Sequence, residues 1–483
     1  MEVGEQNIKL LAEEGVIPPL LEMASGNIES KEASLSALVK LSGCHDNKKL
    51  IAAAGGVPLV LELMSSSHIR TNIIAKCSEI LERLSSHGDG VKFLVDENGT
   101  QVDLKLVIMN LLAFQQNANS SNIVRRPALR ALVGICQYEA GLVKTAVLSA
   151  SGVSLVLPLL DDSDLEIREA AINLLFLFSQ HEPQGVVEYL LRPRRLEALV
   201  GFLENNDKGD VQMAAAGLLA NLPKSEVSVT RRLIELGGLK AIIDIIQSGT
   251  TQAKENALST LFRFTDPTNL ESQRIVVELG AYPLLVDILR VGSITEKARA
   301  AALIGDLSMR SSELTVVSRR ASFWCFCRAN VTRCPAHGGI CNVTTTFCLL
   351  EANALPDLVG LLQGEVHATA YEAIQTLSTL VREDSPQKGA NVLHENGAIG
   401  PILHILTWGS ESLKEEALGL LEKVFMSREM VEYYGSTARL HLVHLTGRSI
   451  NEEGHLQRKA ARVLLLTERY SRSSRTLVVG LPG

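Results

Sequence analysis

The chain has 483 residues, which is longer than the chains that usually fold around a single hydrophobic core. Its length therefore excludes a single small globular domain. Aromatic residues make up only 4% of the chain against 46% hydrophobic residues, so a core must be built of Leu, Ile, Val and Ala, which favours stacked helices over sheets. The 54 acidic residues outnumber the 47 basic ones, and the net charge of −7 argues against nucleic acid as a partner.

The first residues and the cysteines bear on the compartment. Residues 1–14 contain several acidic side chains and no long apolar run, unlike a secretory signal. The uncharged run at residues 145–160 contains a Gly and a Pro and is predicted to be a repeat junction instead of a membrane span. Cys44, Cys77 and Cys136 occur singly in helical patterns, which is typical of buried thiols in a reducing compartment. We therefore expect a soluble, cytoplasmic protein.

Repeated helical patterns begin at once. The segment NIKLLAEEGVIPPLLEM from Asn7 matches NKKLIAAAGGVPLVLELM from Asn47, at an offset of 40 residues. The helices that follow them are predicted at 32–41 and 75–84. Further units are predicted to begin near Gly99, Gly152, Leu196, Ala354, Gly397 and Thr437.

The stretch from Arg231 to Leu307 repeats one pattern at an offset of 43 residues, as RRLIELGGLKAIIDII from Arg231 and RIVVELGAYPLLVDIL from Arg274. A period in the forties with apolar residues at helical spacing is typical of a helical repeat array. Each unit is predicted to contain a short first helix ending at Gly, a second helix, and a third helix with a small Ala that lets neighbours approach. The sequence therefore predicts an all-α solenoid of about ten three-helix units.

One interval is longer than the period. Leu289 and Leu362 occupy equivalent ends of second helices but lie 73 residues apart, about 30 more than the period allows. We assign the excess to an insertion at 311–348. The predicted organisation is a repeat region at 1–310 with about seven units, the insertion, and a repeat region at 349–483 with about three units, a basic C-terminal helix and a short tail.

The segments NKKLIAAAGGVPLVLELM and AAAGLLANLPKSE resemble the armadillo repeat, in which an Ala-rich third helix follows a Gly-x-Pro-x-Leu-Val second helix. AAAGLLANLPKSEVSVTRRLIELGG at 214–238, together with CPAHGGICNVTTTFCLLEANALPDLV at 334–359, is similar to the plant U-box/armadillo ubiquitin ligases, specifically their senescence-associated branch. The likeness covers nearly the whole chain. With the recurring period, it predicts a right-handed armadillo superhelix.

In that family an N-terminal U-box recruits the ubiquitin-conjugating enzyme, but its Cys-Pro-Ile and Asp-Pro-Val pattern does not occur before Gly15. The resemblance implies a ubiquitin-protein ligase, a transferase, although this chain carries no U-box and no recognisable active site. We therefore expect the C-terminal part of a longer protein. Its expected role is a scaffold that recognises protein substrates or receptors, and the alternative is a free-standing armadillo adaptor with no link to ubiquitin transfer.

Armadillo adaptors that bind basic peptides use a ladder of Asn side chains near the ends of successive third helices. At that position the chain offers Asn221 alone, so such an adaptor is disfavoured. His441 and His444 share one helix face, but without a third ligand nearby they are predicted to be solvated surface residues.

The insertion contains enough Cys and His ligands for a four-coordinate structural zinc ion, in the spacing C-x-C-x6-C-x2-H-x3-C-x6-C, and zinc is the one cofactor that the sequence suggests. The six candidate ligands are Cys325, Cys327, Cys334, His337, Cys341 and Cys348.

Two other interpretations of the insertion stay open. Cys325 and Cys327, with aromatic and Arg neighbours, fit acylation or contact with a membrane surface. A flexible loop with incidental cysteines fits as well. Ser322 follows two arginines at the spacing of a basophilic kinase site, where a phosphate would oppose binding to an anionic surface.

The C-terminal region is basic: from Ser436 to the end, the sequence contains eight Lys and Arg residues and only three Glu residues. Several basic side chains on one helix can bind an anionic membrane surface, so peripheral association with the plasma membrane is one expectation. The other is that the polar face caps the solenoid. The membrane-facing candidates are Arg458, Lys459, Arg462 and Arg469.

Overall fold

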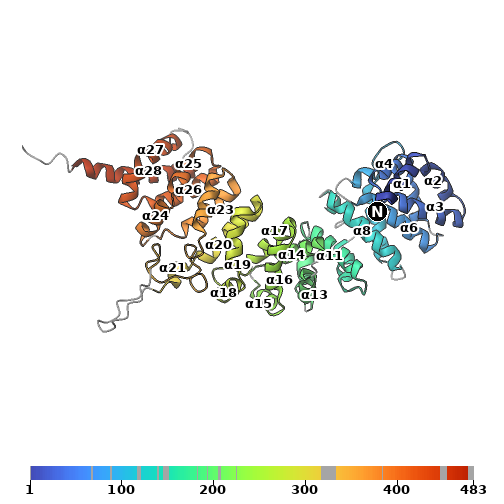
Figure 1. Cartoon of the computed structure of the whole chain (residues 1–483), viewed down its shortest axis with the longest axis horizontal. Helices are drawn as coiled ribbons and strands as arrows, with labels where there is room; N and C mark the ends of the chain where they lie inside the picture. Colours follow the sequence, from blue (N-terminus) through green and yellow to red (C-terminus); the bar gives the residue numbers. More distant parts are fainter. Residues whose placement is uncertain are drawn as a thin grey trace, which may run out of the picture. The chain divides into compact units, whose positions relative to one another are not determined.

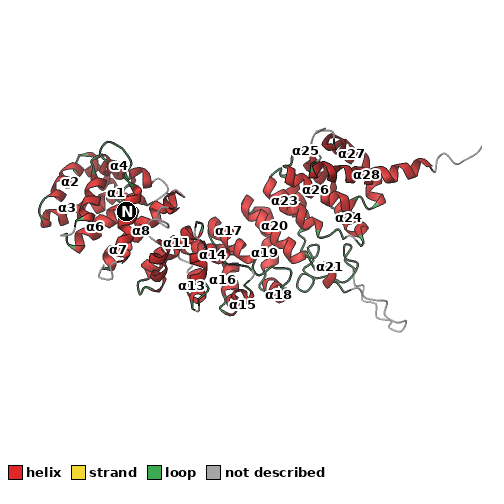
Figure 2. Ribbon diagram, turned by 180° about the vertical axis from the view of Figure 1, so that it is seen from behind, coloured by secondary structure: helices red, strands yellow, loops and turns green. Residues whose placement is uncertain are grey.

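The computed structural model describes residues 2–66, 69–86, 90–116, 121–138, 141–144, 152–181, 183–192, 194–204, 208–224, 226–316, 333–382, 384–446 and 454–476. These residues form helices and connecting turns, and the described part contains two isolated β-bridges but no strand (Figure 2). The all-α prediction is therefore confirmed. The chain divides into two compact units, residues 1–236 and 237–483 (Figure 1).

A row of third helices runs through each unit, each helix packed on the next. These helices carry many small residues, so they can lie close together. In the first unit they are α3 (Ile28–Leu41), α6 (Thr71–Ser85), α8 (Asn122–Tyr138), α11 (Leu165–Ser179) and α14 (Gly209–Asn221). In the second unit they are α17 (Thr251–Leu261), α20 (Ile294–Ser308), α23 (His367–Ser378), α26 (Glu411–Val424) and α28 (His455–Thr476).

A second helix precedes each third helix in the chain. In the first unit the second helices are α2 (Ile17–Ser25), α5 (Gly56–Ser65), α7 (Leu104–Gln116), α10 (Gly152–Val156) with the following η2 (Leu157–Asp161), and α13 (Arg195–Leu203). In the second unit they are α16 (Gly238–Ser248), α19 (Ala281–Val291), α22 (Leu355–Gln363), α25 (Ile399–Trp408) and α27 (Arg428–Thr446).

First helices are less regular than the sequence predicts. They are α1 (Glu2–Glu13), α4 (His45–Ala53), α12 (Pro183–Leu190), α15 (Val227–Glu235), α18 (Leu270–Glu278) and α24 (Pro386–Glu395). In the third repeat the short 3-10 helix η1 (Gly90–Phe93) and a turn closed by a Val95–Gln101 bridge stand in that position. Before α22 the described chain forms α21 (Ser311–Leu314) and then turns. The prediction of three helices in every repeat therefore does not hold for the third repeat or for the repeat that contains α22.

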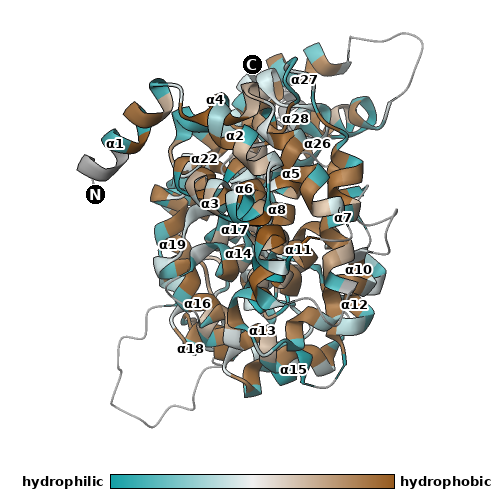
Figure 3. Cartoon of the chain, turned by 90° about the vertical axis from the view of Figure 1, so that its right-hand side faces the viewer, coloured by the Kyte–Doolittle hydropathy of each residue, from teal (hydrophilic) through white to brown (hydrophobic). Residues whose placement is uncertain are grey.

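The core of each unit is aliphatic, as the composition predicts. Leu35, Leu81 and Leu132 on third helices of the first unit are at most 1% exposed. Most helices have an apolar side and a polar side (Figure 3), so burial of the apolar sides requires neighbouring helices. Among the described residues, no helix combines the length and apolar content needed to cross a bilayer.

Gly residues set the turn before several second helices, as the sequence predicts. Gly55 and Gly280 precede α5 and α19 with φ of 78° and 83°, a region that residues with a side chain rarely adopt. Pro356 lies in the first turn of α22, where its missing N–H leaves no hydrogen bond unmade. Local signals therefore fix where these helices begin.

Third helices pack across the insertion as closely as elsewhere. Thr376 Oγ1 on α23 donates to the carbonyl oxygen of Ala301 on α20 at 2.7 Å. A Cβ at Gly305 would lie 2.7 Å from Thr376 Oγ1, so only Gly fits this approach. The extra residues between α20 and α22 therefore leave the row of third helices continuous.

Candidate metal centre

Four of the six predicted ligands lie together between α21 and α22. We call Cys334, His337, Cys341 and Cys348 the Cys/His cluster. Their ligand atoms all lie within 4.8 Å of one another, and no other group of three or more potential ligands does so among the described residues. The Sγ atoms of Cys334 and Cys348 are 3.9 Å apart. His337 Nδ1 lies 3.5 Å from Cys334 Sγ, 3.3 Å from Cys341 Sγ and 3.6 Å from Cys348 Sγ.

These distances match a tetrahedral metal site. A zinc ion with Zn–S bonds of about 2.3 Å and a Zn–N bond of about 2.0 Å would place its sulfur ligands about 3.8 Å apart and its nitrogen about 3.5 Å from each sulfur. Three sulfurs and one imidazole nitrogen are a common structural zinc set, with no open position for a substrate. The residues present therefore fit one structural zinc ion.

Two short turns bring the ligands together. The backbone N–H of Cys334 donates to Gly339 O and that of Gly338 to Cys334 O, both at 2.8 Å, so Cys334 and His337 share one turn. Gly338 has a φ of +73°, which suits a residue without a Cβ. In the second turn the Asn342 side chain accepts from the Thr345 N–H at 2.7 Å. Each ligand is thus placed by local backbone geometry.

The electrostatics of the Cys/His cluster favour a thiolate. The hydrogen bond from the Cys348 thiol, helped by His337, lowers the pKa of Cys334 to about 3. The same hydrogen bond and burial raise the pKa of Cys348, while burial raises that of Cys341. Cysteine sulfurs bind a metal ion as thiolates, so metal binding by these residues would release protons.

Contacts around the Cys/His cluster hold it against the repeat. Cys334 and Cys348 are buried, and Thr315 Oγ1 lies 3.1 Å from Cys341 Sγ. The fully buried Tyr282 of α19 donates its hydroxyl proton to the carbonyl oxygen of Phe347 at 3.2 Å. Sequence reasoning missed both partners, because Tyr282 and Phe347 are 65 residues apart and no local pattern links them.

Three other predicted residues of the insertion, Cys325, Cys327 and Ser322, lie outside the described residues. The membrane, acylation and phosphorylation interpretations that depend on them stay predictions. For residues 333–348, the interpretation as a loop with incidental cysteines does not account for the convergence of four ligands.

The four basic candidates near the C-terminus lie on α28. Arg458 and Arg462 are exposed, whereas the side chain of Arg469 is outside the described set. Lys459 Nζ donates to the Glu415 carbonyl oxygen of α26 at 3.3 Å, and Arg462 Nε lies 3.8 Å from Glu422 Oε1. Two of these cations therefore also hold α28 to its neighbour.

Ion pairs link the third helices of the first unit from α6 to the start of α14. Arg130 of α8 pairs with Glu82 of α6 and Glu166 of α11, at 3.3 and 2.6 Å. Lys208, just before α14, pairs with Glu169 of α11. Arg130, Glu166, Glu169 and Lys208 border a pocket of about 260 Å³. The surface therefore alternates in charge and offers contacts of both signs.

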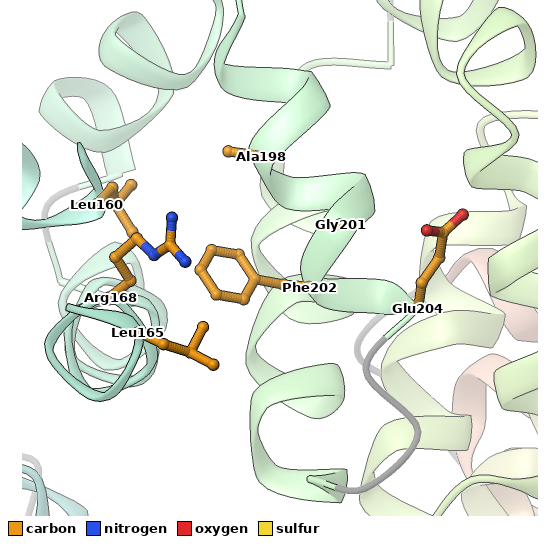
Figure 4. Close-up of a pocket in the computed structure, with 7 residues that line it drawn as sticks. All are labelled: Leu160, Leu165, Arg168, Ala198, Gly201, Phe202 and Glu204. Carbon is orange, nitrogen blue, oxygen red and sulfur yellow. The ribbon is translucent and has the colours of Figure 1, made fainter. Parts of the chain in front are cut away.

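Three other residues named in the sequence analysis, Asn221, His441 and His444, have identifiable surroundings. Asn221 donates through Nδ2 to Ser179 Oγ of the preceding third helix at 2.9 Å, so it links helices. His441 and His444 line a pocket of about 320 Å³ beside α27. A further, mainly apolar pocket of about 360 Å³ lies between α11 and α13, where Arg168 and Phe202 point toward each other (Figure 4).

Comparisons with known proteins find similar sequences in plants. Over 90% of its length it is 27% identical to U-box domain-containing proteins 43 and 44 of Arabidopsis thaliana. Over 84% it is 25% identical to U-box domain-containing protein 24 of Oryza sativa subsp. japonica. The chain is a relative of plant U-box domain-containing proteins. It spans 55–58% of the length of these three relatives.

Structural comparison supports the fold alone. The crystal structure of an engineered protein matches 94% of this chain and 98% of its own chain with a TM-score of 0.62, at 19% sequence identity. No family model matches the chain. The relationship to U-box proteins therefore rests on the sequence similarity.

Proposed function

We propose that the chain is the protein-recognition region of a plant U-box-type ubiquitin ligase. The observation that carries this proposal is the similarity to U-box domain-containing proteins over nine-tenths of the chain. In the proposed arrangement a U-box elsewhere in the same protein recruits the ubiquitin-conjugating enzyme, and the helical repeats hold the protein that receives ubiquitin. The repeats act by binding and positioning.

The polar surface of the third helices is the face we expect a protein partner to contact. Stacked repeats form extended surfaces that bind other proteins, because each added repeat extends the same face. On α8, the half-buried Val133 lies beside the paired charges of Arg130 and Glu166. Apolar contacts flanked by charges of both signs suit a folded protein or a mixed-charge segment.

A ubiquitylation assay tests the link to ubiquitin transfer. The chain alone, supplied with activating and conjugating enzymes, is expected to form no ubiquitin conjugates. The chain joined behind the U-box of a relative is expected to modify proteins that copurify with the chain. The competing function, a free-standing armadillo adaptor, predicts that these copurifying proteins stay unmodified and that the transcript upstream of Met1 encodes no U-box.

A matched pair of substitutions tests the binding face. Val133→Arg places a cation in the third-helix pocket and is expected to reduce partner capture at least tenfold. Leu61→Arg changes a half-buried apolar residue on α5, a second helix, and serves as the control. Equal loss in both variants, with both folded by circular dichroism, would assign recognition to another surface.

We also propose that the Cys/His cluster holds a structural zinc ion within this scaffold. Three cysteines and one histidine at tetrahedral spacing support it. A closed site of this kind stabilises structure and has no position for catalysis. Metal analysis of the purified chain is its first test.

A further inference from the structure

The repeat that contains α22 has no first helix among its described residues. The neighbouring repeats begin with α18 and α24, each directly before a second helix. In the corresponding place, residues 333–354 form turns that lead into α22. We call this segment the Cys loop. Something other than a helix must therefore fill the space between the repeats on this side.

The Cys loop packs where a first helix would. On one side it contacts α19 through the hydrogen bond from Tyr282 to Phe347. On the other, a Cβ at Gly338 would clash with the ammonium of Lys388 on α24, the first helix of the next repeat. Phe347, Cys348 and Leu349 are at most 1% exposed, so the Cys loop buries side chains between the same neighbours.

The Cys loop is poor in the interactions that usually stabilise such a segment. Its backbone makes isolated turns and one bridge, between Val316 and Ile340, instead of a helical ladder. A short segment without regular structure buries too little apolar surface to hold one conformation, and natural small folds use metal ions or disulfides in that case. The three cysteines are free thiols.

We propose that Cys334, His337, Cys341 and Cys348 bind one zinc ion and that the zinc-bound Cys loop takes the place of the first helix of this repeat. The inference rests on the structural zinc proposed above and is independent of any link to ubiquitin transfer. It assigns four ligands and leaves Cys325 and Cys327 out of the site. The metal joins the two turns that carry the ligands, and the turns support α19, α22 and α24.

Other groups of the chain contact the sulfur atoms of the proposed ligands, as is usual around a structural metal ion. The backbone N–H groups of His337 and Glu351 donate to the sulfurs of Cys334 and Cys348. Thr315 Oγ1 approaches Cys341 Sγ. Such partners orient ligands, and their loss typically weakens metal binding about 10- to 100-fold. Thr315→Val is therefore expected to weaken zinc binding about tenfold while all four ligands remain.

Metal analysis with ligand variants tests the assignment. The full chain purified without added chelator is expected to carry about one zinc ion, and Cys334→Ser with Cys341→Ser to carry none. Cys325→Ser with Cys327→Ser and, separately, Cys44→Ser are expected to keep the zinc. Should the double ligand variant fail to fold, His337→Cys is expected to keep the metal and His337→Ala to bind it at least tenfold more weakly.

Hydrogen exchange tests the structural role. Removal of zinc by a chelator is expected to raise exchange in α19 and α22, which contact or follow the Cys loop, while α20 and α23 change little because they pack directly on each other. Metal-free protein with native exchange, or zinc lost on replacing Cys325 and Cys327, would overturn the proposal. These outcomes do not depend on a U-box, so they are distinguishable from failure of the proposed function.

Discussion

Single glycines decide where second helices can start. Gly280 has a φ of +83°, and a Cβ there would meet no other atom within 4 Å, so backbone strain is the one cost of a side chain. Gly419 lies inside α26 in ordinary helical conformation with the same free space. Both positions have room for a Cβ, so Gly280 and Gly419 differ mainly in backbone conformation.

Gly280→Ala is expected to lower the free energy of unfolding by about 1 kcal/mol, because an L side chain disfavours the left-handed conformation. Gly419→Ala is expected to raise it by about 0.5–1 kcal/mol, because Ala loses less entropy in a helix than Gly. Urea unfolding of both variants measures the difference. A stabilised Gly280→Ala variant would contradict the assigned turn.

A buried hydrogen bond between Tyr282 and Phe347 links two residues that are far apart in the sequence. Tyr282 is fully buried and uses its hydroxyl to bind the Phe347 carbonyl, while burial raises its pKa well above the usual value. Phe347 itself has a φ of 51°, an uncommon conformation for a residue with a side chain. This strain is held by the surrounding packing, which is complete on all sides of the ring.

At the scale of elements, third helices pack on one another throughout each unit, whereas first helices differ from repeat to repeat in length and in presence. Successive third helices are joined by side chains, as where Lys423 Nζ donates to Ser378 Oγ at 3.1 Å. First helices are replaced in one repeat by η1 and a turn, and in another by the Cys loop. Variation concentrates there because the row of third helices keeps its contacts without them.

We propose that α28 binds anionic membrane surfaces through its exposed basic side. Each Lys or Arg near an anionic leaflet contributes about 1 kcal/mol. Since Lys459 and Arg462 also contact α26, the expected binding is weak and salt-sensitive. The full chain should float with anionic vesicles and not with neutral ones, and changing Arg458, Lys459, Arg462 and Arg469 to Glu should abolish flotation.

A charge-matched variant controls for net charge. It changes four exposed cations of the first unit to Glu and is expected to float like the unmodified chain. These residues are Lys40, Lys49, Arg70 and Lys105. Equal loss of flotation in both variants, or flotation with neutral vesicles, would leave α28 as a polar cap of the repeat array.

At the scale of the molecule, each unit is a stack in which helices contact their neighbours and little else. The stability of such an array is the sum of the stabilities of its repeats and of the interfaces between neighbouring repeats. A destabilising substitution therefore affects mainly the repeats close to it. Leu81 of α6 is completely buried, and α6 packs against α3, α5 and α8.

Leu81→Ala is expected to lower the local free energy of opening by about 2–5 kcal/mol, through lost apolar contact and the cavity that remains. Hydrogen exchange should rise in α3, α6 and α8 and stay unchanged in α26. Exchange that rises evenly through the chain would indicate a single cooperative core instead of a stacked array.

The sequence by itself determined the helices and their period. Apolar spacing, the Gly before α19 and the Pro in α22 act within a few residues, so they can be read along the chain. The same reasoning located the insertion from the distance between Leu289 and Leu362 and named six ligands for a metal. Sequence similarity then related the chain to U-box domain-containing proteins.

Only the tertiary structure decided which candidate ligands meet and what the described part of the insertion packs against. Cys334 and Cys348 are 14 residues apart, and the turns between them bring their sulfurs within 3.9 Å. The placement of the Cys loop depends on Tyr282, 65 residues before Phe347, and on Lys388 of the next repeat. The chain's local patterns do not encode these contacts, because they form only when stacking brings separate repeats together.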